Sequence, residues 1–307
     1  MFTEVLYRVA FLIAVSLLGW YVGKKFKINS KDISGLLIYV FTPAACFILI
    51  YESPATVGYV VYTFVFYIGA SIAALIAFAI GKVVWKDSRA NLFGAVGGAG
   101  NVGYFVLPLA IGLLKGTEYG AVAIAIVVFV KVSSNIYEFT TAFYLTARGK
   151  NSIVDSLILV MKMPTLYASA LALVLKHFNV ALSPIVISGM DTFVGGYSVL
   201  GMMIIGLSLA KYEKLILDWK FIGLALLWKH VIYTVAVIVL FSSCFNLSQP
   251  EKIVVIMIAC NPLASNISAV ATLLNVHPEK AACAIMASTL LAVITVPFTI
   301  SLALKLI

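Results

Sequence analysis

Charge is what this sequence has least of. Asp, Glu, Lys and Arg together make up 11% of its 307 residues, whereas 63% of the residues are hydrophobic. In soluble domains about a quarter of the residues are charged. A globular surface cannot be built from the few charges of this sequence. The mean hydropathy of +1.10 points the same way. The composition excludes a soluble globular protein and predicts that most of the chain lies in a membrane.

Enzyme and metal-site motifs are also missing. The sequence has no HExxH, no GxSxG, no GxxxxGK[ST] and no paired-carboxylate motif, so we expect neither enzymatic activity nor ATP-driven pumping by this chain alone. Its four cysteines lack CxxC spacing and its three histidines are dispersed. We therefore expect the cysteines to be free thiols packed among apolar residues. We expect the chain to bind no metal and no other cofactor.

Long apolar segments fill the chain instead. A span needs roughly 20 apolar residues, so the length allows about ten spans joined by short connections. Charges, prolines and glycines delimit the candidates, which are 5–23, 33–51, 57–84, 90–114, 119–147, 163–180, 184–210, 219–244, 252–275 and 279–306. Segment 150–162 is too short and too amphipathic to span, and we interpret it as a cytoplasmic linker along the membrane interface, between 1–149 and 163–307.

Basic residues are distributed unequally between alternate connections, and this predicts the orientation. One side has only Lys115, Lys176, Lys252 and Lys305. The other side has Lys24, Lys25, Lys27, Lys31, Lys82, Lys86, Arg89, Arg148, Lys150, Lys162, Lys211, Lys214, Lys220 and Lys280. The richer side is predicted to be cytoplasmic, which places both termini outside a cell (plasma) membrane. The formal net charge of +9 then comes mostly from basic residues in the cytoplasmic connections, which face anionic lipid headgroups. No nucleic-acid partner is expected.

The spacing of the spans indicates an internal repeat. Starts at 5, 57 and 119 recur near 163, 219 and 279, a shift of about 160 residues. Each half has five spans, and because five is odd, two halves of one fold must be inverted relative to each other. Inverted repeats are typical of secondary transporters. The predicted fold is all-α, with ten transmembrane helices in two inverted five-helix repeats.

Two spans at equivalent positions contain helix-breaking residues. Span four has a run of glycines before Asn101 and then Pro108, and span nine has Asn261 and Pro262 with Asn266 close behind. Asn101 and Asn261 are 160 residues apart, which matches the repeat. Broken helices free backbone groups that lipid cannot satisfy, so they survive only where protein or water covers them. Helix N-termini at such breaks suit an anion.

A structural alternative remains for the same residues. The two prolines can be ordinary kinks, and Gly94 and Gly98 form a small-xxx-small pair that would serve helix packing. The matched positions of the breaks favour a binding site.

Span five adds charged groups inside the membrane. Lys131, Asn135 and Glu138 lie on one helical face, and they are expected to face a cavity or one another because charge is costly in lipid. A role in ion coupling and a structural ion-pair network are both open. Lys229 and His230 are interpreted as lying near a span end, with side chains that extend to water; Asp191 is interpreted in the same way.

The segments GNVGYFVLPLAIG in span four, NPLASNISAVATLL in span nine and ASTLLAVITVPF in span ten resemble the auxin efflux carrier family. That family includes plant auxin carriers and prokaryotic relatives described as malate or malonate permeases. The resemblance implies a scaffold domain and a transport domain whose fourth and ninth helices cross at proline breaks. It also implies that the crossing holds the substrate carboxylate. The matching residues are Asn101, Pro108, Asn261, Pro262 and Asn266, as donor, break, donor, break and donor.

The leading hypothesis is a secondary active carrier that moves a small organic anion, such as a dicarboxylate or an auxin-like acid, by alternating access. A Na⁺/H⁺-type cation exchanger on a similar inverted-repeat fold is the alternative, with Lys131 and Glu138 handling the ion. A receptor that binds ligand without moving it would need an output module, and the connections are too short for one. Coupling to Na⁺ or H⁺ and assembly as a homodimer are left open, and the expected partners are the organic anion and the lipid bilayer.

Overall fold

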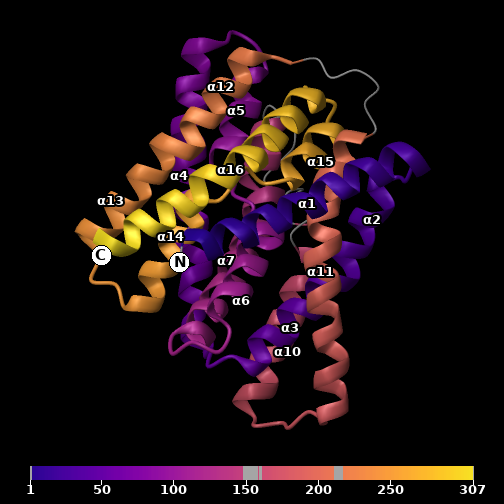
Figure 1. Ribbon diagram of the computed structural model, residues 1–307, viewed down its shortest axis with the longest axis vertical. Coiled ribbons are helices and arrows are strands. Elements are labelled where there is room, and N and C mark those ends of the chain that lie inside the picture. Colours follow the sequence, from indigo (N-terminus) through magenta and orange to yellow (C-terminus); the bar gives the residue numbers. More distant parts are fainter. Residues whose placement is uncertain (1, 148–157, 159–160, 211–216, 307) are drawn as a thin grey trace.

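In a computed structural model, the chain folds into a bundle of helices (Figure 1). The structure describes residues 2–147, 158, 161–210 and 217–306. Within these ranges there is no strand, which confirms the predicted all-α class. The predicted linker 150–162 falls almost entirely outside the described residues.

The helices follow one another with short connections, and three of the long ones contain π-helical turns. The α-helices are α1 (Phe2–Phe26), α2 (Ser30–Leu36), α3 (Thr42–Glu52), α4 (Val60–Val84), α5 (Arg89–Gly97), α6 (Leu107–Leu114), α7 (Gly120–Phe139), α8 (Thr141–Thr146), α10 (Pro164–His177), α11 (Pro184–Ala210), α12 (Trp219–Leu227), α13 (Thr234–Cys244), α14 (Gln249–Cys260), α15 (Asn266–Leu273) and α16 (Pro278–Leu306). The π-helical turns are η1 (Leu37–Phe41), η3 (Val102–Val106) and η4 (Trp228–Tyr233), and η2 (Val57–Tyr59) is a 3₁₀ turn.

Eight of the ten predicted spans are helices long and apolar enough to cross a membrane. They are Phe2–Phe26, Asp32–Glu52, Val57–Val84, Arg89–Leu114, Gly120–Thr146, Pro184–Ala210, Trp219–Cys244 and Pro278–Ala303. The other two differ for identifiable reasons. Helix α10 has 14 residues and is shorter than the roughly 20 that a bilayer requires. The segment predicted as span nine is divided between α14 and α15. A multi-pass membrane protein fits these findings, while the ten-span count and the inverted repeat stay predictions.

Prolines and polar caps account for several helix starts. Helices α10, α11 and α16 each begin with proline, whose fixed φ suits the first helical turn and whose missing N–H is not needed there. Helix α12 is capped by Asp218, which accepts a hydrogen bond from the backbone N–H of Phe221. Helix α14 starts with a capping box between Ser248 and Glu251. These local signals place the helix ends close to where the sequence predicts them.

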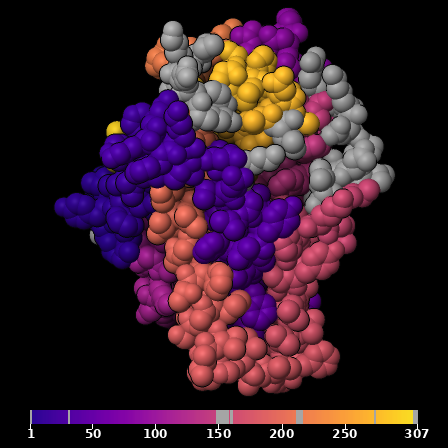
Figure 2. Space-filling model, turned by 90° about the vertical axis from the view of Figure 1, so that its right-hand side faces the viewer, coloured from indigo at the N-terminus to yellow at the C-terminus, as the bar shows by residue number. Residues whose placement is uncertain are grey.

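The helices pack as two groups. In the first group α11 contacts α1 and α3, and α3 contacts α10; Figure 2 shows the N-terminal helices lying against α10 and α11. Helices α1 and α11 also pack against α16. The remaining long helices, α4 to α7 and α12 to α16, form the second group. Helices α1 and α11 approach closely because Gly19 faces Met203 and Gly206 faces Ser16, where any Cβ would overlap the opposite backbone. Such small residues let membrane helices pack in contact along their length.

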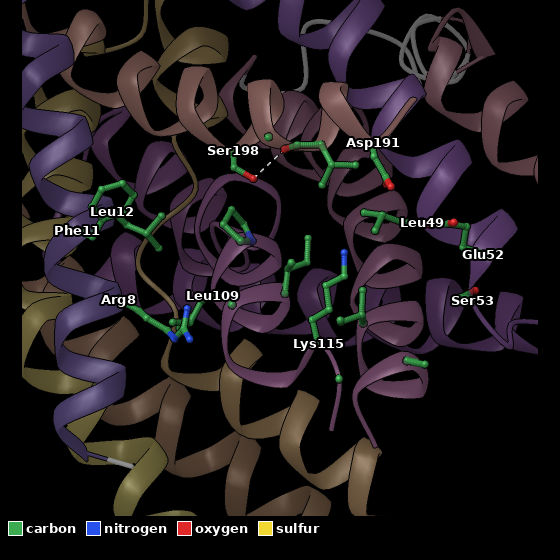
Figure 3. Close-up of a pocket in the computed structure, with 18 of the residues that line it drawn as sticks. Arg8, Phe11, Leu12, Leu49, Glu52, Ser53, Leu109, Lys115, Asp191 and Ser198 are labelled. Carbon is green, nitrogen blue, oxygen red and sulfur yellow. Dashed lines mark hydrogen bonds between the residues drawn. The ribbon is translucent and has the colours of Figure 1, made fainter. Parts of the chain in front are cut away.

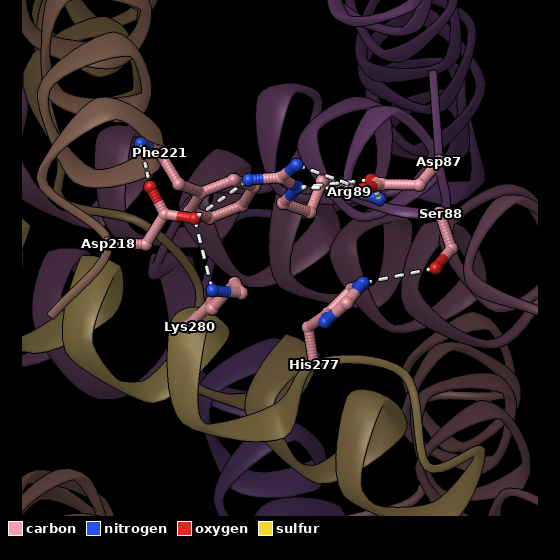
Figure 4. A network of polar contacts seen from close by, with 7 residues as sticks. All are labelled: Asp87, Ser88, Arg89, Asp218, Phe221, His277 and Lys280. Carbon is pink, nitrogen blue, oxygen red and sulfur yellow. Dashed lines mark hydrogen bonds and ion pairs between the residues drawn. The ribbon is translucent and has the colours of Figure 1, made fainter. Parts of the chain in front are cut away.

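A charged network ties three helix starts together at one end of the bundle (Figure 4). The carboxylate of Asp218 accepts hydrogen bonds from Lys280 at 3.0 Å and from Arg89 at 3.3 Å. Asp87 accepts from Arg89 in turn, at 2.9 Å. The hydrogen bonds from Arg89 lower the pKa of Asp87 to about 2. Burial alone would raise the pKa of Asp218, but the Phe221 N–H and Lys280 outweigh it and hold that pKa below its usual range.

Candidate functional site

The first break in the bundle separates α5 from η3 at residues 98–101. Glycine has a poor helix propensity, and the run that contains Gly98 and Gly100 ends the helix. Asn101 then caps the next turn, because its side-chain oxygen accepts from the N–H of Tyr104 at 3.2 Å. Carbonyls at the end of α5 are satisfied from other helices: Tyr137 donates to Ala95 at 2.8 Å and Trp228 donates to Gly97 at 2.8 Å.

The second break separates α14 from α15 at residues 261–265. Pro262 disfavours a helical conformation at the residue before it, and Asn261 is extended, with φ −67° and ψ 153°. The freed backbone groups again find partners on other helices. The N–H of Leu263 donates to the hydroxyl of Ser288 at 3.0 Å, and Thr234 donates to the carbonyl of Ala259 at 2.9 Å.

The two breaks meet in space. The backbone N–H of Asn101 donates to the carbonyl of Pro262 at 2.8 Å. Gly100 faces the side chain of Asn261 so closely that a Cβ there would overlap the amide. Asn101, Asn261 and Pro262, predicted from two distant segments, are therefore brought together in one crossing.

Several buried polar atoms at this crossing have no hydrogen-bond partner within the described part of the chain. They are the side-chain nitrogen of Asn101, both polar atoms of the Asn261 amide and the hydroxyl of Ser265. Asn261 is 0% exposed and Asn101 is 3% exposed. A buried unpaired polar atom costs about 1–3 kcal/mol, so a group of them in one place indicates a site that is completed by a ligand or by water.

Pro108 does not have the predicted role. It is the second residue of α6, which continues without interruption from η3, and the break lies at residues 98–101 instead. The wider π-helical turn ahead of Pro108 accommodates the missing N–H without opening the helix. Its ring lines a different pocket from the crossing.

The polar residues of α7 lie beside the crossing. Lys131 donates to Asn135 at 2.7 Å, and its ammonium is 5.5 Å from the ring centre of Tyr104. Glu138 accepts from Asn266, the first residue of α15, at 2.8 Å and from Ser134 at 3.2 Å. Within the described residues Lys131 and Glu138 form no ion pair with each other or with other groups. The structure thus places the lysine in the site without a carboxylate partner.

Lys229 and His230 were predicted near a span end and are instead buried in its middle. Lys229 is 1% exposed and His230 is 8% exposed. Both lie in η4, between α12 and α13, too far from either helix end to extend to water. His230 bonds Ser288 at 2.8 Å, the same hydroxyl that accepts from Leu263 at the second break. No periodicity or motif in the sequence links these residues to the break.

A pocket of about 750 Å³ lies between the two helix groups. Arg8, Lys115, Glu52 and Asp191 line it together with apolar side chains, and Figure 3 shows Lys115 and Asp191 extending toward its interior. Its floor includes Pro108 and Leu109 of α6. The rings of Tyr104 and Tyr197 lie 5.4 Å apart, and the Tyr104 ring also faces the ammonium of Lys131. Neither tyrosine was a predicted site residue, although Tyr104 falls within the GNVGYF segment.

No family model and no curated protein matches this chain. Membership of the auxin efflux carrier family is therefore a prediction that depends on the residues of spans four, nine and ten. The geometry of the crossing does not depend on it.

Proposed function

We propose that this chain is a secondary carrier for a small organic anion, with the substrate carboxylate held at the crossing of the two broken helices. The observation that carries the proposal is the set of unpaired polar atoms there. The amide nitrogens of Asn101 and Asn261 have no acceptor within the described residues, and a carboxylate supplies acceptors on two oxygens. Binding would remove the cost of leaving these donors unpaired.

Charge supports the same ligand class. Lys131 is 3% exposed, and its contacts among the described residues are the amide of Asn135 and the ring of Tyr104, both uncharged. A buried cation without a counter-ion is strongly unfavourable. An anionic substrate at the crossing would provide that counter-ion, so we propose that Lys131 contributes to substrate affinity.

The packing suits alternating access. The pocket that contains Arg8 and Lys115 lies between the two helix groups, and a carrier of this type exposes its site to one side by moving one group against the other. The walls of the pocket are mostly apolar and carry two basic side chains, Arg8 and Lys115, and two acidic ones, Glu52 and Asp191. The apolar walls fit the hydrocarbon body of an organic acid. The resemblance to the auxin efflux carrier family is consistent with such a substrate, and we propose membership of that family on this basis.

The proposal is tested by transport into proteoliposomes that contain the purified chain. Radiolabelled mono- and dicarboxylates and an aromatic acid are offered to wild type, Asn261→Ala and the matched control Asn246→Ala. Asn246 is exposed in the connection before α14. We expect at least one acid to be transported by wild type and by the control, with a loss of tenfold or more in Asn261→Ala at an unchanged yield of folded protein. Equal transport by both variants would refute the role of the crossing.

One observation favours the cation exchanger as a second candidate. Glu138 is 2% exposed and contacts Asn266 beside the second break, so a carboxylate that could bind Na⁺ or H⁺ lies close to the crossing. Na⁺/H⁺ exchange by proteoliposomes in the absence of any organic acid would establish this candidate. Acid transport without such exchange would exclude it.

A further inference from the structure

A second buried lysine lies near the crossing, and the proposed carrier mechanism does not use it. Lys229 is 1% exposed, and its ammonium is 4.0 Å from the ring centre of Tyr233. No hydrogen bond or ion pair joins this ammonium to any of the described residues. The ring face compensates part of a buried positive charge, and the remainder calls for an anion.

The ammonium adjoins a small cavity of about 30 Å³. Its lining includes Gly98 and Gly100 of the first break, Ser133 and Ser134 of α7, and Tyr233 beside Lys229. The described residues of this lining supply hydroxyl groups and no carboxylate. The hydroxyl of Ser134 already donates to Glu138, which does not line the cavity. A lining that combines the ammonium of Lys229 with hydroxyl groups and contains no carboxylate favours an anion as the ligand.

The size of the cavity restricts the ligand. About 10–15 Å³ is enough for one water molecule, so 30 Å³ has room for a single small particle. Lys131 lines a different cavity, together with Tyr104, Asn135 and Asn266. The cavity at Lys229 adjoins the crossing at Gly100, but its lining does not include Lys131, Asn101 or Asn261.

We propose that Lys229 binds a monoatomic anion, a chloride ion, in this cavity, with the hydroxyls of Ser133 and Tyr233 as further donors. The ion would neutralise the buried lysine. This inference does not rest on the proposed function, because chloride binding needs no transported substrate.

The test is the thermal stability of the purified full chain in detergent. Sodium gluconate is replaced stepwise by sodium chloride or sodium bromide at constant ionic strength, and the unfolding temperature is followed. A ligand that binds only the folded state raises this temperature in a saturable manner. We expect a saturable rise with chloride and bromide for wild type, and none with gluconate, which is too large for the cavity.

Variants separate this site from the substrate site. Lys229→Met should lose the halide response, whereas Lys131→Met and Asn261→Ala should keep it even if both fail to transport acids. If Lys229→Met does not fold, Ser133→Ala keeps the charge and should shift the chloride midpoint about tenfold upward through one lost hydrogen bond. Equal unfolding temperatures of wild type in chloride and gluconate would overturn the proposal, as would a halide response that survives in Lys229→Met or disappears in Lys131→Met.

Discussion

The backbone N–H of Asn101 donates to the carbonyl of Pro262 at 2.8 Å, across two helices whose breaks are far apart in the sequence. Each break leaves backbone groups that lipid cannot satisfy, and this bond lets one break satisfy the other. The crossing is therefore one structural unit, and a change at either break should affect both.

Gly100 offers the most direct test of that unit. A Cβ at this position would overlap the amide of Asn261, so Gly100→Ala should destabilise the protein by about 1–3 kcal/mol through overpacking. The matched control is Gly189→Ala in α11, where an added Cβ meets nothing within 4 Å. The control should be neutral or more stable by up to about 1 kcal/mol. Thermal unfolding of both variants measures the difference, and equal unfolding temperatures would contradict the close packing of the crossing.

The sequence located the two breaks with unequal success. Pro262 acts locally on the residue before it, so the second break could be placed from two adjacent residues. Pro108 has the same local chemistry, yet the helix absorbs it in a π-helical turn and breaks at the glycines instead. The spacing of Asn101 and Asn261 predicted equivalent positions in a repeat, and the family resemblance implied that their helices cross. The outcome at Pro108 depends on which neighbours can satisfy freed backbone groups, and a single sequence does not contain that information.

Contacts from other helices were the least predictable part. Trp228 donates to Gly97, and Ser288 accepts from Leu263, across large separations and without a motif. The interior position of Lys229 was misjudged because long side chains near helix ends usually extend to water. Lys229 lies in η4, in the middle of the helix that runs from α12 to α13, so its side chain is too far from either end to extend to water.

Ser288 should prove important for the second break. Its hydroxyl is the acceptor for the N–H of Leu263 and is also bonded to His230, and the residue is 0% exposed. Ser288→Ala would leave a buried N–H unpaired at a cost of about 1–3 kcal/mol. Ser242→Ala, at an exposed site in α13, is the control and should change stability little. Unfolding temperatures within one degree of each other would show that water or another group serves Leu263.

Glu138 distinguishes the two candidate functions. Glutamine in its place can still accept from Asn266 through its oxygen and donate to the hydroxyl of Ser134 through its nitrogen, so folding should be preserved while the charge is lost. For an anion carrier, acid transport by Glu138→Gln should stay within about threefold of wild type, less than the effect of one neutral hydrogen bond. A cation exchanger would lose its activity, because Glu138 is the only carboxylate beside the crossing among the residues that the structure describes. Flux assays for acids and for Na⁺ on the same proteoliposomes give the answer.

The network at Asp218 predicts a pH dependence of stability. Asn at this position keeps an oxygen that can cap α12 but loses the ion pairs with Lys280 and Arg89, so Asp218→Asn should be less stable than wild type at pH 7 by up to about 1 kcal/mol. Asp218→Ala also loses the cap to Phe221, which adds about 1 kcal/mol.

The sign of the pH effect follows from the lowered pKa of Asp218. A carboxyl whose folded pKa lies below its ordinary value of 3.8 stabilises the folded state above that value and stops doing so as the pH falls toward the folded pKa. The difference in unfolding temperature between wild type and Asp218→Asn should thus be constant from pH 7 to about pH 5 and should shrink below pH 4. Asp87 titrates in both proteins and cancels in the comparison. A difference that persists unchanged into acid would mean that packing, and not the charge of Asp218, holds the starts of α5, α12 and α16 together.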